Sequence, residues 1–285
     1  MIRMPEARID QFISEDIPYI DLTCEVLGIG DEPGEMTYFT REDAVLAGTD
    51  VVRRIMAHLG CEVVVAAADG ERITAGESFF TVRGRAADLH AAWKVCLNVF
   101  DHLSAVATKT RAMVDAAHGA NPHCEVLTTR KSMPGAKDLL TCAVMAGGAF
   151  PHRLGLSETV LVFSHHLTFF GGFDAFVAQL PDLRAKCVEK KLFVEAKADQ
   201  ALTLARASAQ GRGVDGIQMD KIPVDELKPL VAELRGIAPH VTLIAAGGIN
   251  PQNAAAYVAC GVDGLATTAP FAAKPLDMSV RMRAL

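Results

Sequence analysis

The feature that most constrains the fold is a repeated alternation of short β-rich runs with amphipathic helical stretches, which begins after Gly119. The predicted strands occupy residues 125–129, 159–163, 192–196, 216–219, 241–246 and 264–268. Helical stretches lie between them, and in one of these, residues 225–235, the apolar side chains share one face. The alternation is typical of parallel βαβ units.

Six or seven such units can form an open doubly wound sheet or close into a barrel, and periodicity alone does not distinguish the two. The residues that follow the strands distinguish an open sheet from a barrel. Charged side chains or glycine pairs stand at the ends of four different strands: Arg130 and Lys131, Glu195, Asp220, and Gly247 with Gly248. Because (β/α) barrels build their sites at the carboxyl ends of several strands, we favour a barrel over residues 111–270.

The first part of the chain has a different pattern of predicted secondary structure. Strand-like runs at 61–67 and 78–82 are separated by turn-rich segments, and a helical pattern from 86 to about 117 carries one apolar stripe. We expect an N-terminal α+β domain over residues 1–110 that includes this linking helix. The C-terminal tail, about 271–285, is expected to pack back on it. The whole chain is then of the α/β class.

Charge and composition exclude several classes of function. The formal net charge of −6 gives no basic surface for nucleic acid, so a cationic site has to be local and suited to a small ligand. No window is apolar enough to span a membrane, and the first residues lack a signal-peptide pattern. Seven cysteines without Cys-x-x-Cys spacing indicate free thiols. We expect a soluble, cytoplasmic protein.

The strongest local motif is Ala246-Gly247-Gly248-Ile249-Asn250-Pro251, directly after an apolar strand. Two glycines allow backbone amides to approach an anion, and Asn250 followed by Pro251 predicts a helix start. The motif therefore predicts a phosphate site at a helix N-terminus. The alternative is a tight turn without a ligand.

Two further motifs supply cations. Arg130 and Lys131 end the first barrel strand, and His152 and Arg153 follow the glycine pair Gly147-Gly148. Converging basic groups at loop positions would bind carboxylates or phosphates. Surface ion pairing is the alternative for either motif alone.

Glu195 and Asp220 each close a predicted strand, where carboxylates could bind ribose hydroxyls or hold Mg²⁺ directly or through water. Carboxylates beside a phosphate imply a cation between them. An ion pair of Asp220 with Lys221 is the alternative. His165 and His166, if they continue a strand, point to opposite faces and are not expected to share a metal.

In their order and spacing these motifs resemble quinolinate phosphoribosyltransferases. The resemblance rests on Thr-Arg-Lys-x-x-Pro-Gly, Gly-Gly-x-x-x-His-Arg-x-Gly-Leu, Val-Glu-Ala, Met-Asp and Gly-Gly-Ile, and it extends over nearly the whole chain. It implies an N-terminal open sandwich, a C-terminal (β/α) barrel, and a homodimer in which two subunits share each active site. The implied reaction joins phosphoribosyl diphosphate to quinolinate with Mg²⁺, and releases diphosphate and carbon dioxide.

The resemblance also implies roles for individual residues. Arg130, His152, Arg153 and His166 would bind the anionic acceptor, with Lys131 nearby as a catalytic cation, and Lys94 would reach in from the partner subunit. Glu195 and Asp220 would act on the ribose and metal. The phosphate-binding positions would be Gly247, Gly248, Thr267 and Thr268.

Some positions depart from the family pattern. Phe163 and Ser164 stand where the family has Lys and Asp, Ala246 stands for Ser, and Thr267 and Thr268 stand for glycine. The loss of a lysine at Phe163 predicts an acceptor that is smaller, less acidic or differently shaped than quinolinate. Two alternatives stay open: a non-catalytic protein that binds an oxyanion such as molybdate, and a different barrel enzyme acting on a sugar phosphate.

Overall fold

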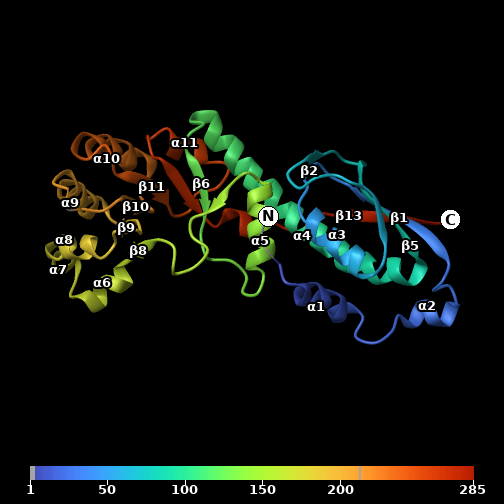
Figure 1. The fold of residues 1–285 in the computed structure, drawn as a ribbon. Coiled ribbons are helices and arrows are strands. Elements are labelled where there is room, and N and C mark those ends of the chain that lie inside the picture. Colours follow the sequence, from blue (N-terminus) through green and yellow to red (C-terminus); the bar gives the residue numbers. More distant parts are fainter. Residues whose placement is uncertain (1–3, 212) are drawn as a thin grey trace. The chain divides into compact units, whose positions relative to one another are not determined.

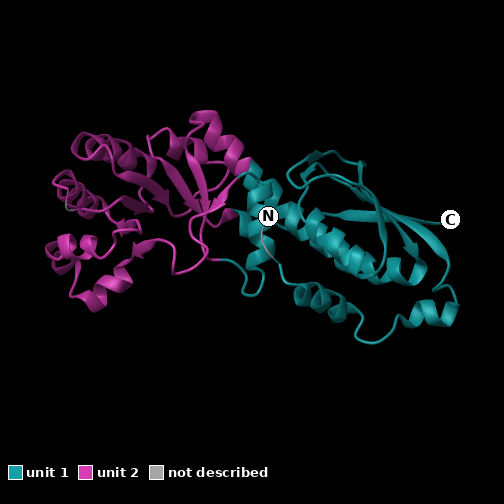
Figure 2. Ribbon diagram, viewed as in Figure 1, with its two compact units in different colours: residues 1–111, 132–148, 270–285 teal, residues 112–131, 149–269 magenta. Residues whose placement is uncertain are grey.

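The computed structural model describes residues 4–211 and 213–285. The chain divides into two compact units (Figure 2). The first unit comprises residues up to 111 together with 132–148 and 270–285, and the second comprises 112–131 and 149–269. Segment 132–148 therefore belongs with the N-terminal part, whereas the sequence placed it in the barrel.

The first unit is built on a four-stranded antiparallel sheet of order β13-β1-β5-β3. Its strands are β1 (Pro33–Thr40), β3 (Glu62–Ala66), β5 (Ser78–Arg85) and β13 (Met278–Ala284), and a small pair is formed by β2 (Ala44–Val45) and β4 (Arg72–Ile73). The helices are α1 (Glu6–Asp16), α2 (Leu22–Leu27), α3 (Thr49–His58), α5 (Lys137–Ala146) and the first part of α4 (Ala86–Ala120). The tail returns to this unit as β13, which pairs with β1 along its whole length.

The core of the first unit lies between this sheet and α4. Every second residue of β1 is buried, as expected for a strand with one face on a core. Tyr38 from β1 and Phe79 from β5 both meet Phe100 of α4 edge to face, with ring centroids 5.3 and 5.0 Å apart.

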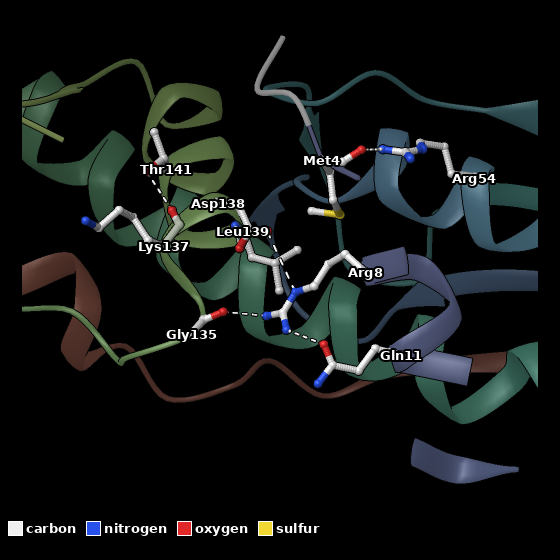
Figure 3. Close-up of polar contacts among 9 residues, drawn as sticks. All are labelled: Met4, Arg8, Gln11, Arg54, Gly135, Lys137, Asp138, Leu139 and Thr141. Atoms are coloured by element: carbon white, nitrogen blue, oxygen red, sulfur yellow. Dashed lines mark hydrogen bonds and ion pairs between the residues drawn. The ribbon is translucent and has the colours of Figure 1, made fainter. Parts of the chain in front are cut away.

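Arg8 explains why segment 132–148 belongs to the first unit (Figure 3). From α1 its guanidinium donates to the Gly135 carbonyl and to Gln11 Oε1, and it lies 3.7 Å from the Asp138 carboxylate. Arg54 of α3 in turn donates to the Met4 carbonyl at 2.8 Å. The contacts of Arg8 with Gly135 and Asp138 join residues more than 120 positions apart, so they leave no local pattern in the sequence.

Asp101 on α4 holds the start of β13. Its Oδ1 accepts a hydrogen bond from the Met278 amide at 3.0 Å, and its main-chain carbonyl accepts one from Leu276. Burial raises the pKa of Asp101 to about 6; the Met278 amide lowers it and nearby Asp277 raises it further. Between about pH 4 and 6 the folded protein keeps a proton that the unfolded chain releases, so stability falls as pH rises through this window.

We therefore expect Asp101→Asn, which keeps an oxygen acceptor for Met278, to stabilise the protein at neutral pH. The gain is about 1 kcal/mol for this half-exposed carboxyl, or about 2–4 °C in the midpoint of thermal unfolding at pH 7.5. The difference should vanish at pH 4, where both side chains are neutral. A gain of equal size at both pH values would contradict the titration as its cause.

The second unit is a curled, fully parallel sheet of order β7-β6-β12-β11-β10-β9-β8. Its strands are β6 (Glu125–Thr128), β7 (Phe150–Pro151), β8 (Val160–Val162), β9 (Leu192–Ala196), β10 (Gly216–Asp220), β11 (Thr242–Ala246) and β12 (Gly264–Thr267). The last strand pairs with the first, which curls the sheet into a barrel. Within the described residues the barrel is open between β7 and β8, since these two strands are not paired.

Helices cover the outside of this sheet (Figure 1). They are α6 (Ser164–Phe170), α7 (Phe173–Ala178), α8 (Leu180–Ala185), α9 (Ala198–Ala209), α10 (Val224–Ile237) and α11 (Ala254–Val258), and a 3₁₀ turn follows at Ala269–Ala272. No helix among residues 4–211 and 213–285 is both long and apolar enough to cross a membrane.

The barrel interior is filled by a compact apolar cluster. It comprises Leu161, Phe193, Ile244, Ala246 and Ala266, with Leu127 and Phe163 packed against it. Gly216 makes room for the largest member, because a Cβ at this position would overlap the Phe193 ring. The α/β class, with an N-terminal α+β part and a C-terminal parallel curled sheet, is confirmed. All six predicted barrel strands are present, and only the two-residue β7 was not foreseen.

Candidate active site

The carboxyl ends of the second unit's strands gather most of the predicted site residues at one rim. Arg130 and Lys131 follow β6, Arg153 follows β7, Glu195 and Asp220 lie at the ends of β9 and β10, and the two glycines follow β11. Because all seven strands run parallel and β12 joins β6, these positions meet around a single opening. Lys94 is exposed on α4 in the first unit, where its Nζ lies 4.7 Å from the centroid of the neighbouring Trp93 ring.

Glu195 and Asp220 form a carboxylate pair. Burial raises the pKa of Glu195, and the negative charge of Asp220 raises it further; a hydrogen bond from Gln218 and the positive charges of Lys131 and Lys221 lower it. Two carboxylates that repel each other in this way favour a cation between them.

Gln218 is a site residue that the sequence interpretation missed. It is 7% exposed, pairs in register with Glu195 across β9 and β10, and donates from Nε2 to Glu195 Oε2 at 2.8 Å. Its spacing could have identified it from the sequence. Gln218 lies two residues before Asp220 on an otherwise apolar strand, so the two side chains share a face. Gln218 thus orients the carboxylate of Glu195.

Arg153 is a buried cation with no carboxylate in direct contact among the residues described. It is 9% exposed, donates to the Thr159 carbonyl at 3.3 Å, and has no carboxylate within ion-pair distance in the described part of the chain. Burial lowers the pKa of its guanidinium, the positive charge of Arg130 adds to the effect, and the negative charge of Glu158 opposes it. Arg130 and Lys131 are exposed at the same rim and likewise lack carboxylate partners among the residues described. An anion is the ligand that such a group of cations stabilises.

His152 is half-buried, and its two ring nitrogens are covered. Both ring nitrogens are buried without a hydrogen-bond partner among residues 4–211 and 213–285, and the ring meets Phe193 edge to face with centroids 6.0 Å apart. Burial lowers the pKa of His152, with the positive charge of Arg153 acting in the same direction. Both effects favour the neutral imidazole.

Phe163 forms an aromatic wall together with His166. The two rings stack with centroids 5.8 Å apart, and the Arg153 guanidinium lies 5.8 Å from the Phe163 ring. The expectation that His165 and His166 continue a strand is wrong. Both lie on α6, because His166 Nδ1 accepts the Phe163 amide at 2.9 Å and caps the first turn of that helix.

The glycine loop is tightly organised. Gly247 and Gly248 have φ values of 90° and 74°, in the left-handed region that glycine adopts without strain. The side-chain amides of Asn250 and Asn253 both donate to the Gly248 carbonyl. The helix expected from Asn250 begins later: α11 starts at Ala254 with Asn253 as its N-cap, because residues 250–253 first form a turn.

The two threonines after this loop differ in their surroundings. Thr267 is buried, and its hydroxyl donates to the Ile249 carbonyl at 2.6 Å and accepts from the Ala269 amide at 3.0 Å. Its side chain therefore supports the glycine loop from within. Thr268 is half-buried at the end of β12.

Comparison with known proteins identifies the class. Profiles of the N-terminal and C-terminal domains of quinolinate phosphoribosyl transferase match residues 21–104 and 106–281, and the chain belongs to this family. Within it, the chain is 40% identical over 259 residues to the ModD protein of Rhodobacter capsulatus, provisionally named a pyrophosphorylase; the match covers 90% of this chain and 96% of that protein.

Enzymes named for the family reaction are also similar. The carboxylating nicotinate-nucleotide pyrophosphorylase of Mycobacterium leprae is 32% identical over 262 residues, covering 90% of this chain and 89% of that one. The structure of the nicotinate-nucleotide pyrophosphorylase from Francisella tularensis superposes with a TM-score of 0.86 at 24% identity, covering 99% and 98% of the two chains. The fold is therefore shared along the full length.

Proposed function

We propose that this protein transfers a phosphoribosyl group from phosphoribosyl diphosphate to quinolinate or a related heteroaromatic acid, and releases diphosphate. The observation that carries the proposal is the rim of the second unit, where a glycine loop and a carboxylate pair lie at the same end of the barrel as three cations, none of which forms an ion pair within the described residues. The first two suit a ribose phosphate, and the cations suit an acidic acceptor.

Each group has a defined task in such a transfer. The amides of Gly247 and Gly248 bind the 5′-phosphate, and Glu195, oriented by Gln218, binds the ribose hydroxyls. As diphosphate departs, positive charge develops on the ribose, and the two carboxylates stabilise it. Arg130, Lys131 and Arg153 hold the acceptor so that its ring nitrogen attacks C1 of the ribose, the carbon that diphosphate leaves.

The residues present fit Mg²⁺ that arrives with the diphosphate. Among residues 4–211 and 213–285 no three His, Cys, Asp or Glu side chains group closely enough to hold a metal by themselves. Mg²⁺ is typically bound by one or two carboxylates plus substrate phosphates, and Glu195 and Asp220 supply such a pair. The ion would neutralise the leaving diphosphate.

Lys94 is assigned to the partner subunit's site. It is exposed on α4 and has no carboxylate within ion-pair distance in the part of the chain that the structure describes, so its charge is available to a ligand. Since the family resemblance implies that this lysine reaches in from the partner subunit, the proposal includes a homodimer in which two chains complete each active site.

Phe163 shapes the acceptor side of this site. Its ring packs against the barrel cluster and lies next to Arg153, so it offers an apolar face where a second cation would otherwise stand. The Phe163 ring offers a flat face to a heteroaromatic ring, and with a phenyl group in place of a lysine the site has one cation fewer to balance a second carboxylate.

Phe163→Lys should consequently shift binding toward dicarboxylate acceptors. We expect quinolinate to bind about tenfold more tightly, because the new ammonium adds a charge-assisted contact. Calorimetric titration with quinolinate and with nicotinate measures the change. Phe169→Lys is the matched control, since Phe169 is 93% exposed on α6; an equal gain in that variant would show that added charge alone is responsible.

A turnover assay tests the proposal as a whole. The purified protein is incubated with phosphoribosyl diphosphate, Mg²⁺ and a panel of pyridine and purine bases, and diphosphate release is followed. Release with a heteroaromatic acid supports the proposal. Tight calorimetric binding of molybdate together with no binding of phosphoribosyl diphosphate would overturn it in favour of an oxyanion-binding protein.

A further inference from the structure

Lys221, directly after Asp220, has an unusual backbone. Its φ of 57° makes it the one non-glycine residue with positive φ among residues 4–211 and 213–285. This conformation costs an ordinary side chain roughly 1–2 kcal/mol, and such strain is concentrated at functional sites. It is maintained by a hydrogen bond from the Lys221 amide to the Ala246 carbonyl at 2.8 Å, which ties the residue to the strand leading into the glycine loop.

The side chain of Lys221 lies against the glycine loop. A Cβ at Gly247 would overlap Lys221 Cγ and would come within 2.7 Å of the Lys221 amide nitrogen. The first methylene groups of the lysine therefore occupy the space that a side chain at position 247 would need. The Lys221 side chain can take this position only because residue 247 is a glycine.

The ammonium of Lys221 is left for a ligand. The residue is exposed, and in the described part of the chain no carboxylate lies within ion-pair distance of Nζ, not even that of adjacent Asp220. The surface ion pair considered from the sequence is therefore not formed. The charge nevertheless acts on the carboxylate pair, since it lowers the pKa of Glu195.

We infer that Lys221 binds phosphate oxygens of the ribose phosphate substrate, as a cation placed between the glycine loop and the carboxylate pair. The assignment rests on the proposed function and extends it. Of the cations that act on Glu195, Lys221 is the one whose side chain lies against the glycine loop, so its charge offsets the repulsion between a phosphate on the loop and the carboxylates. A glycine or asparagine would fit the backbone of position 221 at little cost, so the strained lysine is explained by its ammonium.

Three variants test the assignment. Lys221→Asn removes the charge but tolerates the left-handed backbone, Lys221→Arg keeps the charge, and Lys228→Asn removes an exposed lysine from α10 as a control. Ribose 5-phosphate without Mg²⁺ is the probe, titrated by calorimetry, with phosphoribosyl diphosphate and Mg²⁺ in parallel.

We expect Lys221→Asn to bind ribose 5-phosphate about 10- to 100-fold more weakly, with no loss of thermal stability. Lys221→Arg should stay within about threefold of the parent, and Lys228→Asn should match it. If Lys221→Asn keeps the parent's affinity while the parent binds phosphoribosyl diphosphate, the inference is overturned and the proposed function stands. If ribose 5-phosphate binding depends on Lys221 but no acceptor is turned over, the inference stands and the proposed function falls. Absence of binding to both probes overturns both.

Discussion

Gly247→Ala should weaken the binding of phosphoribosyl diphosphate at least about 100-fold and destabilise the second unit by about 2–4 kcal/mol. The added methyl group would overlap the Lys221 side chain and come within 2.7 Å of Asp220 Oδ1 and of the Lys221 amide nitrogen. The amide belongs to the backbone and cannot turn aside. The φ of 90° adds strain of its own, so the loop has to move away from the carboxylate pair.

Gly248→Ala is the matched control. Gly248 also has positive φ, 74°, but nothing lies within 4 Å of the position its Cβ would take. Only the conformational cost applies, roughly 1–2 kcal/mol, and phosphate binding should fall by less than about tenfold. Calorimetry and thermal unfolding of both variants measure the contrast. Equal effects at the two positions would show that left-handed backbone alone, and not the close approach to Asp220 and Lys221, makes the loop sensitive.

The features that local pattern could predict are those of the barrel. A buried parallel strand is a short β-rich run with turn residues after it, so all six predicted runs correspond to strands and their ends form the rim. The two-residue β7 was not predicted, because Phe150 and Pro151 are too short a run to show a period.

Features that depend on distant contacts could not be predicted in the same way. Segment 132–148 joins the first unit through contacts such as those of Arg8 with Gly135 and Asp138, and no local property of the segment reveals them. The hydroxyl of Thr267, a position that the family resemblance assigns to phosphate binding, donates to the Ile249 carbonyl, 18 residues away.

The residues added to the site lie beside ones that the sequence did identify. Gln218 precedes Asp220 by two positions and Lys221 follows it by one. An isolated glutamine or lysine carries no pattern, and its role appears only when the neighbouring strands are placed: Gln218 against Glu195, and Lys221 against Gly247. Strand register, which pairs Gln218 with Glu195, is the information that the sequence lacked.

A substitution of Glu195 can show whether the carboxylates at the rim serve ligand binding or the stability of the fold. Burial and the charge of Asp220 raise the pKa of Glu195, so ionising this carboxyl is less favourable in the folded protein than in the unfolded chain. A carboxylate kept for stability would not be placed there. Glu195→Gln removes the charge and keeps the shape, and its side-chain oxygen can still accept the hydrogen bond from Gln218.

We therefore expect Glu195→Gln to leave the midpoint of thermal unfolding unchanged or higher, while phosphoribosyl diphosphate with Mg²⁺ binds about 10- to 100-fold more weakly. Glu233→Gln, on the exposed side of α10, should change neither quantity. Binding at the parent's affinity would remove Glu195 from the site. Lost binding with a marked fall in thermal stability would instead make it a structural residue, because strain relieved at a functional carboxylate raises stability rather than lowering it.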